Sequence, residues 1–154
     1  MIDPKWTGHA LAPSTLCIDR ARLRFFAKAI GETDPVYTDV AAARAAGYPD
    51  LPAPPTFVFA AEMDSGAIDR LLRTLEIPLA KLLHGEQGFT WHRPLCAGDT
   101  ATVRSTVTGI YAKKNGALEF VVKESTVDNQ HGERVAELRS VLVCRHDQPQ
   151  EDAR

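Results

Sequence analysis

A histidine and a carboxylate lie two residues apart in the segment His84-Gly85-Glu86-Gln87. Side chains two positions apart on a strand point to the same face, so His84 and Glu86 could form a hydrogen-bonded pair in a cleft. Histidine has an ordinary pKa close to neutral pH, so such a pair could perform general acid–base catalysis. Gly85 would let a ligand approach the backbone closely, and Gln87 would be a binding residue beside it. A purely structural pair explains the same spacing equally well.

A second segment with ionisable groups is Glu32-Thr33-Asp34-Pro35-Val36-Tyr37. Glu32 could act as a carboxylate base. Tyr37 has an ordinary pKa of about 10, so it cannot accept a proton near pH 7, although its hydroxyl could orient a water or a carbonyl group. The structural alternative is that Asp34 starts a turn and that Tyr37 packs beside the core.

Apolar residues at intervals of three and four predict helices on both sides of the second segment and after a proline-rich stretch. Residues 51–55 must be extended, because each proline fixes its own φ and keeps the preceding residue out of the α region. The stretch leads to Thr56, which could cap the following helix. The predicted helices are residues 19–30 with Asp19 as N-cap, 40–46 with Asp39 as N-cap, one from Thr56 through Phe57 to Ala61, and 68–75.

Strands dominate the second half of the chain, which is rich in Val, Thr, Phe and Leu. Asn115-Gly116 predicts a two-residue hairpin, because both residues tolerate positive φ. Helices followed by an antiparallel meander indicate one α+β domain over residues 1–146, with 147–154 as a disordered polar tail. The predicted strands are 82–92, 100–113, 117–128 and 134–145, with a further one within 9–17 that completes a five-stranded sheet.

The composition is that of one globular domain, with 154 residues, 44% of them hydrophobic and 25% charged. The net charge of −2 and the scattered basic residues argue against nucleic acid as a partner. Cys17, Cys96 and Cys144 lack the spacing of metal ligands, so we expect no metal, and neither a disulfide nor a cofactor is indicated. No signal peptide or membrane-length apolar run is evident, so we expect a soluble cytoplasmic protein without a membrane partner.

Four segments in order resemble the MaoC and FAS1-like dehydratase domains. The similarity extends from about Cys17 to Arg145. It implies a single hot-dog domain, an antiparallel sheet wrapped around a central helix, that assembles in pairs. It also implies (R)-specific hydration of trans-2-enoyl thioesters of CoA or acyl carrier protein, or the reverse dehydration, without a metal or redox cofactor. The segments are Ile30–Asp39 followed by Ala41–Tyr48, Ala53–Phe57, His84–Gln87 and Arg93–Thr100.

The resemblance also implies where the reaction would occur. In the family, an aspartate directly after the signature glycine and a histidine five positions later hold and deprotonate the water. Glu32 and Tyr37 occupy these two positions here. Asp34 lies between them and would belong to the binding surface.

The proline-rich stretch also departs from the family, in which a His-Gly pair usually precedes the central helix. Pro54 and Pro55 take that place here. Backbone N–H groups of Thr56 and Phe57 could still polarise a thioester carbonyl, because the first turn of a helix leaves its donors unpaired. Arg93 could meet a CoA phosphate, or it could be an ordinary solvated charge.

These features lead to one main hypothesis and two alternatives. The main hypothesis is the degenerate, acyl-binding half of a hydratase or dehydratase, paired as a heterodimer with a MaoC-like subunit that carries the Asp/His pair. The first alternative is a self-sufficient homodimeric hydratase that uses His84 and Glu86. The second is a non-catalytic module that binds acyl thioesters. Acyl length, the choice of CoA or carrier protein and the direction of reaction stay open.

Overall fold

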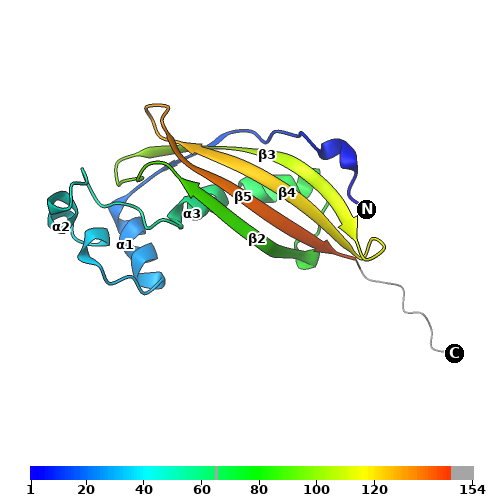
Figure 1. The fold of residues 1–154 in the computed structure, drawn as a ribbon, viewed down its shortest axis with the longest axis horizontal. Coiled ribbons are helices and arrows are strands. Elements are labelled where there is room, and N and C mark those ends of the chain that lie inside the picture. The colour runs from blue at the N-terminus through cyan, green and yellow to red at the C-terminus, as the bar shows by residue number, and fades with distance from the viewer. Residues whose placement is uncertain (65, 147–154) are drawn as a thin grey trace.

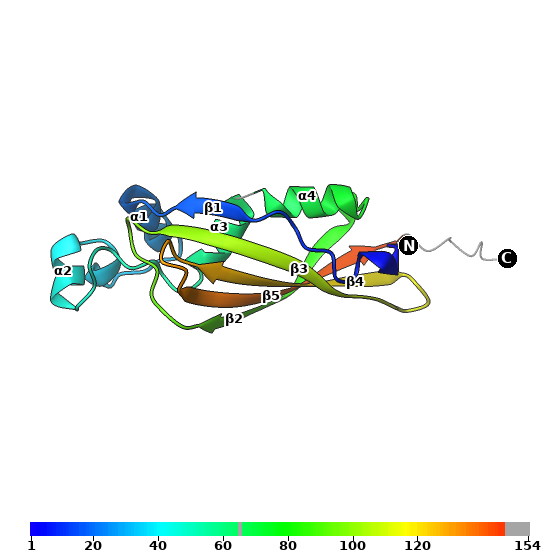
Figure 2. The same cartoon turned by 90° about the horizontal axis from the view of Figure 1, so that it is seen from above.

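The computed structural model describes residues 1–64 and 66–146. Five strands form one antiparallel sheet in the order β1-β3-β4-β5-β2. Helices lie on one face of this sheet and at one end of it (Figures 1 and 2). The strands are β1 (Ser14–Cys17), β2 (Leu82–Trp91), β3 (Thr100–Lys113), β4 (Leu118–Asp128) and β5 (Arg134–Arg145). The α-helices are α1 (Arg20–Ala29), α2 (Val40–Ala45), α3 (Phe57–Asp64) and α4 (Ala67–Thr74), and the 3₁₀ turns are η1 (Pro4–Trp6), η2 (Pro35–Tyr37) and η3 (Leu79–Lys81).

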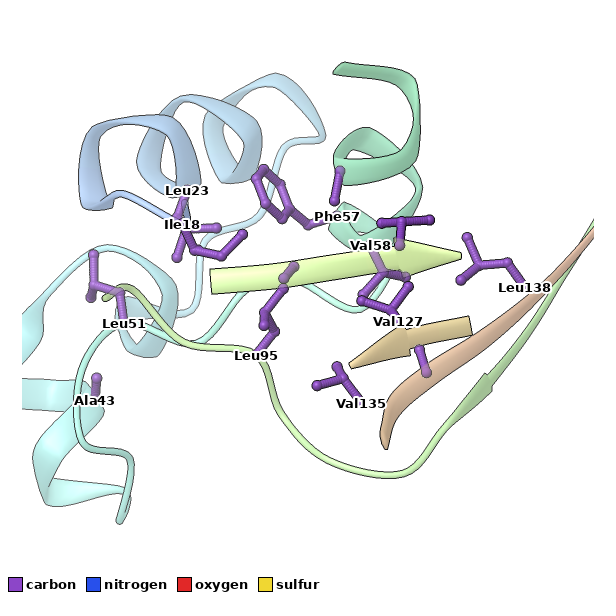
Figure 3. Packing of buried hydrophobic residues seen from close by; sticks show 14 residues of the cluster. Ile18, Leu23, Ala43, Leu51, Phe57, Val58, Leu95, Val127, Val135 and Leu138 are labelled. Carbon is purple, nitrogen blue, oxygen red and sulfur yellow. The ribbon is translucent and has the colours of Figure 1, made fainter. Parts of the chain in front are cut away.

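The core lies between the sheet and α3 (Figure 3). Alternate residues of the long strands point inward, because successive strand side chains face opposite sides of a sheet. A sheet packed around a central helix is the single α+β hot-dog domain expected from the sequence. The largest buried cluster includes Ile18, Leu23, Leu51, Phe57, Val58, Val103, Val127, Val135 and Leu138.

The predicted helix caps before α1 and α2 are confirmed. The Asp19 carboxylate accepts a hydrogen bond from the backbone N–H of Arg22 at 2.9 Å. The Asp39 carboxylate accepts from the N–H groups of Ala41 and Ala42 at 2.7 and 3.0 Å. Each cap satisfies donors that a helix otherwise leaves unpaired, so both helices begin one residue after their capping aspartate.

One predicted detail of the sheet is wrong and another is confirmed. The β3–β4 connection has four residues rather than two, because Lys114, Asn115 and Gly116 all adopt positive φ, of 51°, 52° and 86°. The predicted first strand is confirmed: β1, Ser14–Cys17, lies within residues 9–17 and completes the five-stranded sheet, and Ala10 adds an isolated bridge to Thr106 of β3.

Two further expectations concern the ends and surfaces of the chain. The predicted tail, residues 147–154, lies outside the described residues. Within the described part, no helix has the length and apolar character needed to cross a membrane.

Candidate functional site

A cavity of about 520 Å³ opens between the residues that precede α3 and the end of β2. Its volume lies in the range typical of small-molecule sites, and its wall is mostly apolar with a few polar groups, as such sites usually are. The residues around it include Tyr37, Tyr48, Pro55, Val58, Trp91, His92, Arg93 and Val135.

The proline-rich segment forms one wall of this cavity, because backbone hydrogen bonds hold it in place. Ala53 N–H donates to Leu95 O at 2.6 Å, and Ala97 N–H donates to Leu51 O at 2.9 Å. The indole N–H of Trp91 donates to Pro55 O at 2.9 Å and joins the end of β2 to this wall. The wall is therefore built before any ligand arrives.

Tyr37 lies in the cavity wall, at the position where the resemblance implies a histidine. Partial burial raises its pKa, and the nearby charges of Glu32, Tyr48 and Asp34 raise it further. The hydroxyl therefore stays protonated at neutral pH, where it can donate a hydrogen bond to a carbonyl or a water but cannot serve as a base.

Glu32 does not line this cavity, and its carboxylate already serves its own loop. Glu32 Oε1 accepts from the backbone N–H groups of Thr33 and Asp34 at 2.8 and 2.9 Å. The Asp34 carboxylate accepts from Val36 N–H at 2.9 Å and caps η2, which agrees with the structural reading of this aspartate. Both acids thus stabilise the turn that carries Tyr37.

The predicted pairing of His84 with the Glu86 carboxylate is wrong. The pairing register of β2 with β5 shifts between these residues, so a β-bulge breaks the alternation on which the prediction depended. The His84 ring lies 3.1 Å from the backbone oxygen of Glu86, whereas the Glu86 carboxylate accepts from the Arg139 guanidinium at 3.0 Å. Neither side chain is buried.

The bulge also explains why residue 85 is glycine. A Cβ at Gly85 would lie 2.9 Å from Val143 Cγ2 and 3.2 Å from Val141 O. Close approach of the neighbouring strand, rather than of a ligand, requires this glycine. Gln87 is similarly engaged within the sheet, because its side-chain oxygen accepts from the Ser140 hydroxyl at 2.7 Å.

The start of α3, which follows the proline-rich segment, has fewer free backbone N–H donors than the sequence predicts. The Phe57 N–H donates to Pro54 O at 2.8 Å, so this donor is already in use, and Phe57 itself is buried against Phe26. The Thr56 backbone oxygen accepts from Phe59 N–H at 3.1 Å. Pro55 lines the cavity, whereas Thr56 and Phe57 do not.

Two cationic or titratable side chains lie at the cavity mouth. Arg93 Nη1 lies 3.4 Å from Glu133 Oε1, and His92 Nε2 lies 3.7 Å from Glu137 Oε1. The sequence reading missed His92, as it missed Tyr48 and Trp91. The sequence indicates these three residues only indirectly. The prolines at 54, 55 and 94 predict two extended segments in this region, but they do not show which side chains the segments enclose.

A buried polar cluster lies between α3 and the sheet, and none of its members lines the cavity. The Lys123 ammonium and the Ser125 hydroxyl donate to Glu62 Oε1, and the Ser105 hydroxyl donates to the same oxygen at 3.2 Å. Burial lowers the pKa of Lys123, while the adjacent Glu62 opposes that shift. The strand alternation predicts that Lys123 points inward, but the sequence gives no partner for it.

No group of three or more Asp, Glu, His or Cys side chains suited to a metal ion occurs in residues 1–64 and 66–146. Cys96 and Cys144 are buried and Cys17 is exposed. Burial, together with the charge of Asp99, raises the pKa of Cys96 to about 11. A thiol in such surroundings is not a nucleophile near neutral pH.

The chain matches the family model of the FAS1-like dehydratase domain region over residues 5–138. It is 36% identical to a UPF0336 protein of Streptomyces avermitilis over 145 residues, which are 94% of this chain and 95% of that protein.

Two solved structures are similar in fold and sequence. One is the C-terminally truncated HadBC (3R-hydroxyacyl-ACP dehydratase) complex of Mycobacterium tuberculosis, with 26% identity and a TM-score of 0.77 over 90% of this chain and 96% of the matched one. The other is a MaoC-like dehydratase, with 27% identity and a TM-score of 0.80 over 91% of this chain but 42% of that longer chain.

Proposed function

The chain belongs to the FAS1-like dehydratase family, and we propose that it is the acyl-binding subunit of an (R)-specific enoyl-thioester hydratase or 3-hydroxyacyl-thioester dehydratase. A MaoC-like partner supplies the aspartate and histidine that move the protons. The observation that carries this proposal is the tyrosine at position 37, in the cavity wall and with its pKa raised. A hydroxyl in that state can hold a substrate but cannot activate water.

The remaining groups near the cavity support a binding role. The wall combines prolines, aromatic rings and Tyr37, a tyrosine whose pKa is raised, and such a surface suits an acyl thioester. Glu32, the other residue in the family's catalytic positions, is committed to two backbone N–H groups of its loop. Both hydrogen bonds are accepted by Oε1, so they fix the orientation of the carboxylate toward its own loop and away from the cavity, which Glu32 does not line.

The free edge of β2 supports association with a second hot-dog subunit. β2 is ten residues long, and among the described residues it pairs with β5 alone, so its outer edge presents backbone groups that no other strand of this sheet pairs. Proteins usually cover or pair such an edge. Trp91, half exposed at the end of this strand, adds apolar surface beside the cavity. A partner on this edge would place its own residues near the cavity mouth.

The test is reconstitution with a MaoC-like subunit that contains an intact Gly-Asp-x-Asn-Pro-aliphatic-His signature. We expect little hydration of enoyl-CoA by the isolated chain and clear hydration by the mixture, followed through loss of the conjugated enoyl absorbance. Replacing the signature histidine of the partner by alanine should abolish the activity, whereas Tyr37→Phe should lower it by only about 2- to 10-fold. Strong hydration by the isolated chain would reject the proposal.

His92 supports a second candidate, a self-sufficient hydratase. Its imidazole lies in the cavity wall, 3.7 Å from the Glu137 carboxylate, which could orient it as a base. This candidate replaces His84 and Glu86, which do not form a pair, as the groups for independent catalysis. Activity of the isolated chain that disappears in His92→Ala would establish it. Binding of acyl-CoA without turnover, alone or with every MaoC-like partner, would instead favour a non-catalytic binding module.

A further inference from the structure

The outer face of the sheet, opposite α3 and α4, carries no helix in the described part of the chain (Figure 2). The strand register shows which side chains share this face. Leu83 of β2, Val143 of β5, Phe120 of β4 and Tyr111 of β3 form one row across four strands. Leu83 and Tyr111 are 51% and 41% exposed. A continuous apolar row therefore faces solvent.

A second outward row adjoins the first and extends it. Val141 of β5 pairs with Val122 of β4, one step along the strands from Val143 and Phe120. We call these two rows the outer apolar patch, and its members are Leu83, Tyr111, Phe120, Val122, Val141 and Val143. Val141 is only 2% exposed, so the other five residues form the accessible part of the patch. An antiparallel sheet that is apolar on only one face can leave the other in water, but a sheet with apolar rows on both faces needs a cover.

One border of the patch is cationic, and the other contains a glutamate that forms no ion pair among the described residues. On one side lie Lys113, Lys114 and Arg145, and the Lys113 ammonium lies over the stacked rings of Tyr111 and Phe120, 5.6 and 5.1 Å from their centroids. On the other side the sheet surface forms a hollow of about 790 Å³ whose charged lining residues are Arg104, Glu124, Glu137 and Arg139. Arg104, Glu137 and Arg139 each form an ion pair, with Asp128, Arg134 and Glu86 respectively.

Glu124 is the charged residue of this hollow that is available for an intermolecular ion pair. Within residues 1–64 and 66–146, no cationic side chain lies within ion-pair distance of its carboxylate. The neighbouring Arg139 is committed to Glu86 at 3.0 Å. A cation from outside could therefore pair with Glu124.

We propose that a second copy of this chain covers the outer apolar patch, with the two sheets packed face to face. The two copies are related by a two-fold axis that lies in the interface and runs parallel to the rows, across the strands. Such an axis, placed between the two rows, lays each apolar row of one copy over the other row of its partner. It also brings the Lys113 border of each copy over the Glu124 hollow of the other. The contact is isologous, so each charge pairing occurs twice.

The geometry and size of the face suit this packing. Two stacked sheets lie about 10 Å apart with their strands about 30° from parallel. Four strands about 4.8 Å apart and six residues spaced about 3.4 Å apart give a face of roughly 20 Å by 20 Å in projection. This is about 400 Å² per copy, or about 800 Å² in total, which lies below the roughly 1,200 Å² at which stable specific interfaces begin and in the range of weak, transient assemblies. An anionic membrane surface suits the patch less well, because it would offer no cation to the Glu124 carboxylate.

The test is sedimentation velocity of the full chain over a range of concentrations. We expect the apparent mass of the wild type at high concentration to be twice that of Tyr111→Glu, because the new charge would be buried at the contact. Lys113→Glu and Glu124→Lys should each halve the mass in the same way, and the double variant Lys113→Glu/Glu124→Lys should restore it. Arg24→Glu, on α1 and away from this face, is the matched control and should keep the wild-type mass.

Three results would overturn the proposal. The first is an unchanged mass in Tyr111→Glu when circular dichroism shows that the variant is folded. The second is failure of the charge-exchanged double variant to reassociate after each single change has dissociated the protein. The third is binding of the wild type to vesicles of anionic phospholipid, lost in Tyr111→Glu, while both proteins keep one mass in solution. The proposal does not depend on hydratase activity, so these results do not bear on the proposed function.

Discussion

Glu62 and Glu32 are both glutamates that accept hydrogen bonds, but they lie in opposite surroundings. Glu62 is fully buried in the core and is held by an ammonium and two hydroxyls. Glu32 is partly exposed on a loop and is held by two backbone N–H groups. Perturbed ionisable groups often mark active sites, yet structural ion pairs are perturbed too. In this chain the strongly buried pair lies in the core, and the candidate site has no comparable one.

The largest expected effect comes from breaking the buried pair. Lys123→Met would leave the Glu62 carboxylate buried without its cation, so we expect the free energy of unfolding to fall by about 3–5 kcal/mol. Urea denaturation measures this loss. The double variant Glu62→Leu/Lys123→Met removes both charges and should recover most of the stability. If Lys123→Met lowered the free energy of unfolding by less than about 1 kcal/mol, the Glu62–Lys123 pair would not be a dominant buried interaction.

A third carboxylate, Glu86, extends the comparison to β2, where the bulge at Gly85 separates it from His84. Gly85→Ala would push a methyl group to within 2.9 Å of Val143, so we expect a loss of about 1–3 kcal/mol in urea denaturation. Gly88→Ala is the matched control on the same strand, because its new Cβ would have no neighbour closer than 3.8 Å. Equal stability of the two alanine variants would mean that the bulge can relax.

The sequence predicts the long strands and three of the four α-helices to within a residue or two, whereas α3 continues to Asp64, three residues beyond the predicted end. Apolar periodicity and the caps at Asp19 and Asp39 are local signals. It could not predict the β-bulge that separates His84 from Glu86. A bulge inserts one residue against a neighbouring strand, so only the pairing of β2 with β5 reveals it. The bulge is the reason that one of the two predicted catalytic pairs failed.

The candidate site was predicted only in part, for a related reason. Tyr37, Pro55 and Arg93 were identified from their place in the chain, and all three line the cavity. Tyr48, Trp91 and His92 complete the wall because distant segments meet there through backbone hydrogen bonds. The partner of Lys123 was equally hidden, since Glu62 is 61 residues away in the sequence.

Replacing Tyr37 should have a smaller effect than either core change. In the reconstituted complex we expect Tyr37→Phe to lower kcat/KM by about 2- to 10-fold, the size of one lost hydrogen bond. The pKa of Tyr37 is raised above its usual value of about 10, so this contribution should not titrate below pH 10. Tyr111→Phe, on the outer face, is the control and should leave kcat/KM unchanged. A loss of several hundred-fold in Tyr37→Phe would instead assign this tyrosine a role in proton transfer.

The cysteines test whether burial keeps an ionisable group unreactive near the cavity as well as in the core. The measurement needs no substitution that destabilises the protein. Cys96 adjoins the cavity residue Leu95, and with a pKa of about 11 only about one thiol in a thousand is ionised at pH 8. We expect iodoacetamide to modify Cys17 readily in the folded protein and to reach Cys96 and Cys144 only after unfolding, as mass spectrometry of the intact chain would show. Cys17→Ser should then have no fast-reacting thiol. Rapid alkylation of Cys96 in that variant would mean that the Cys96 loop opens in solution, and the wall of the cavity would be mobile where the core is fixed.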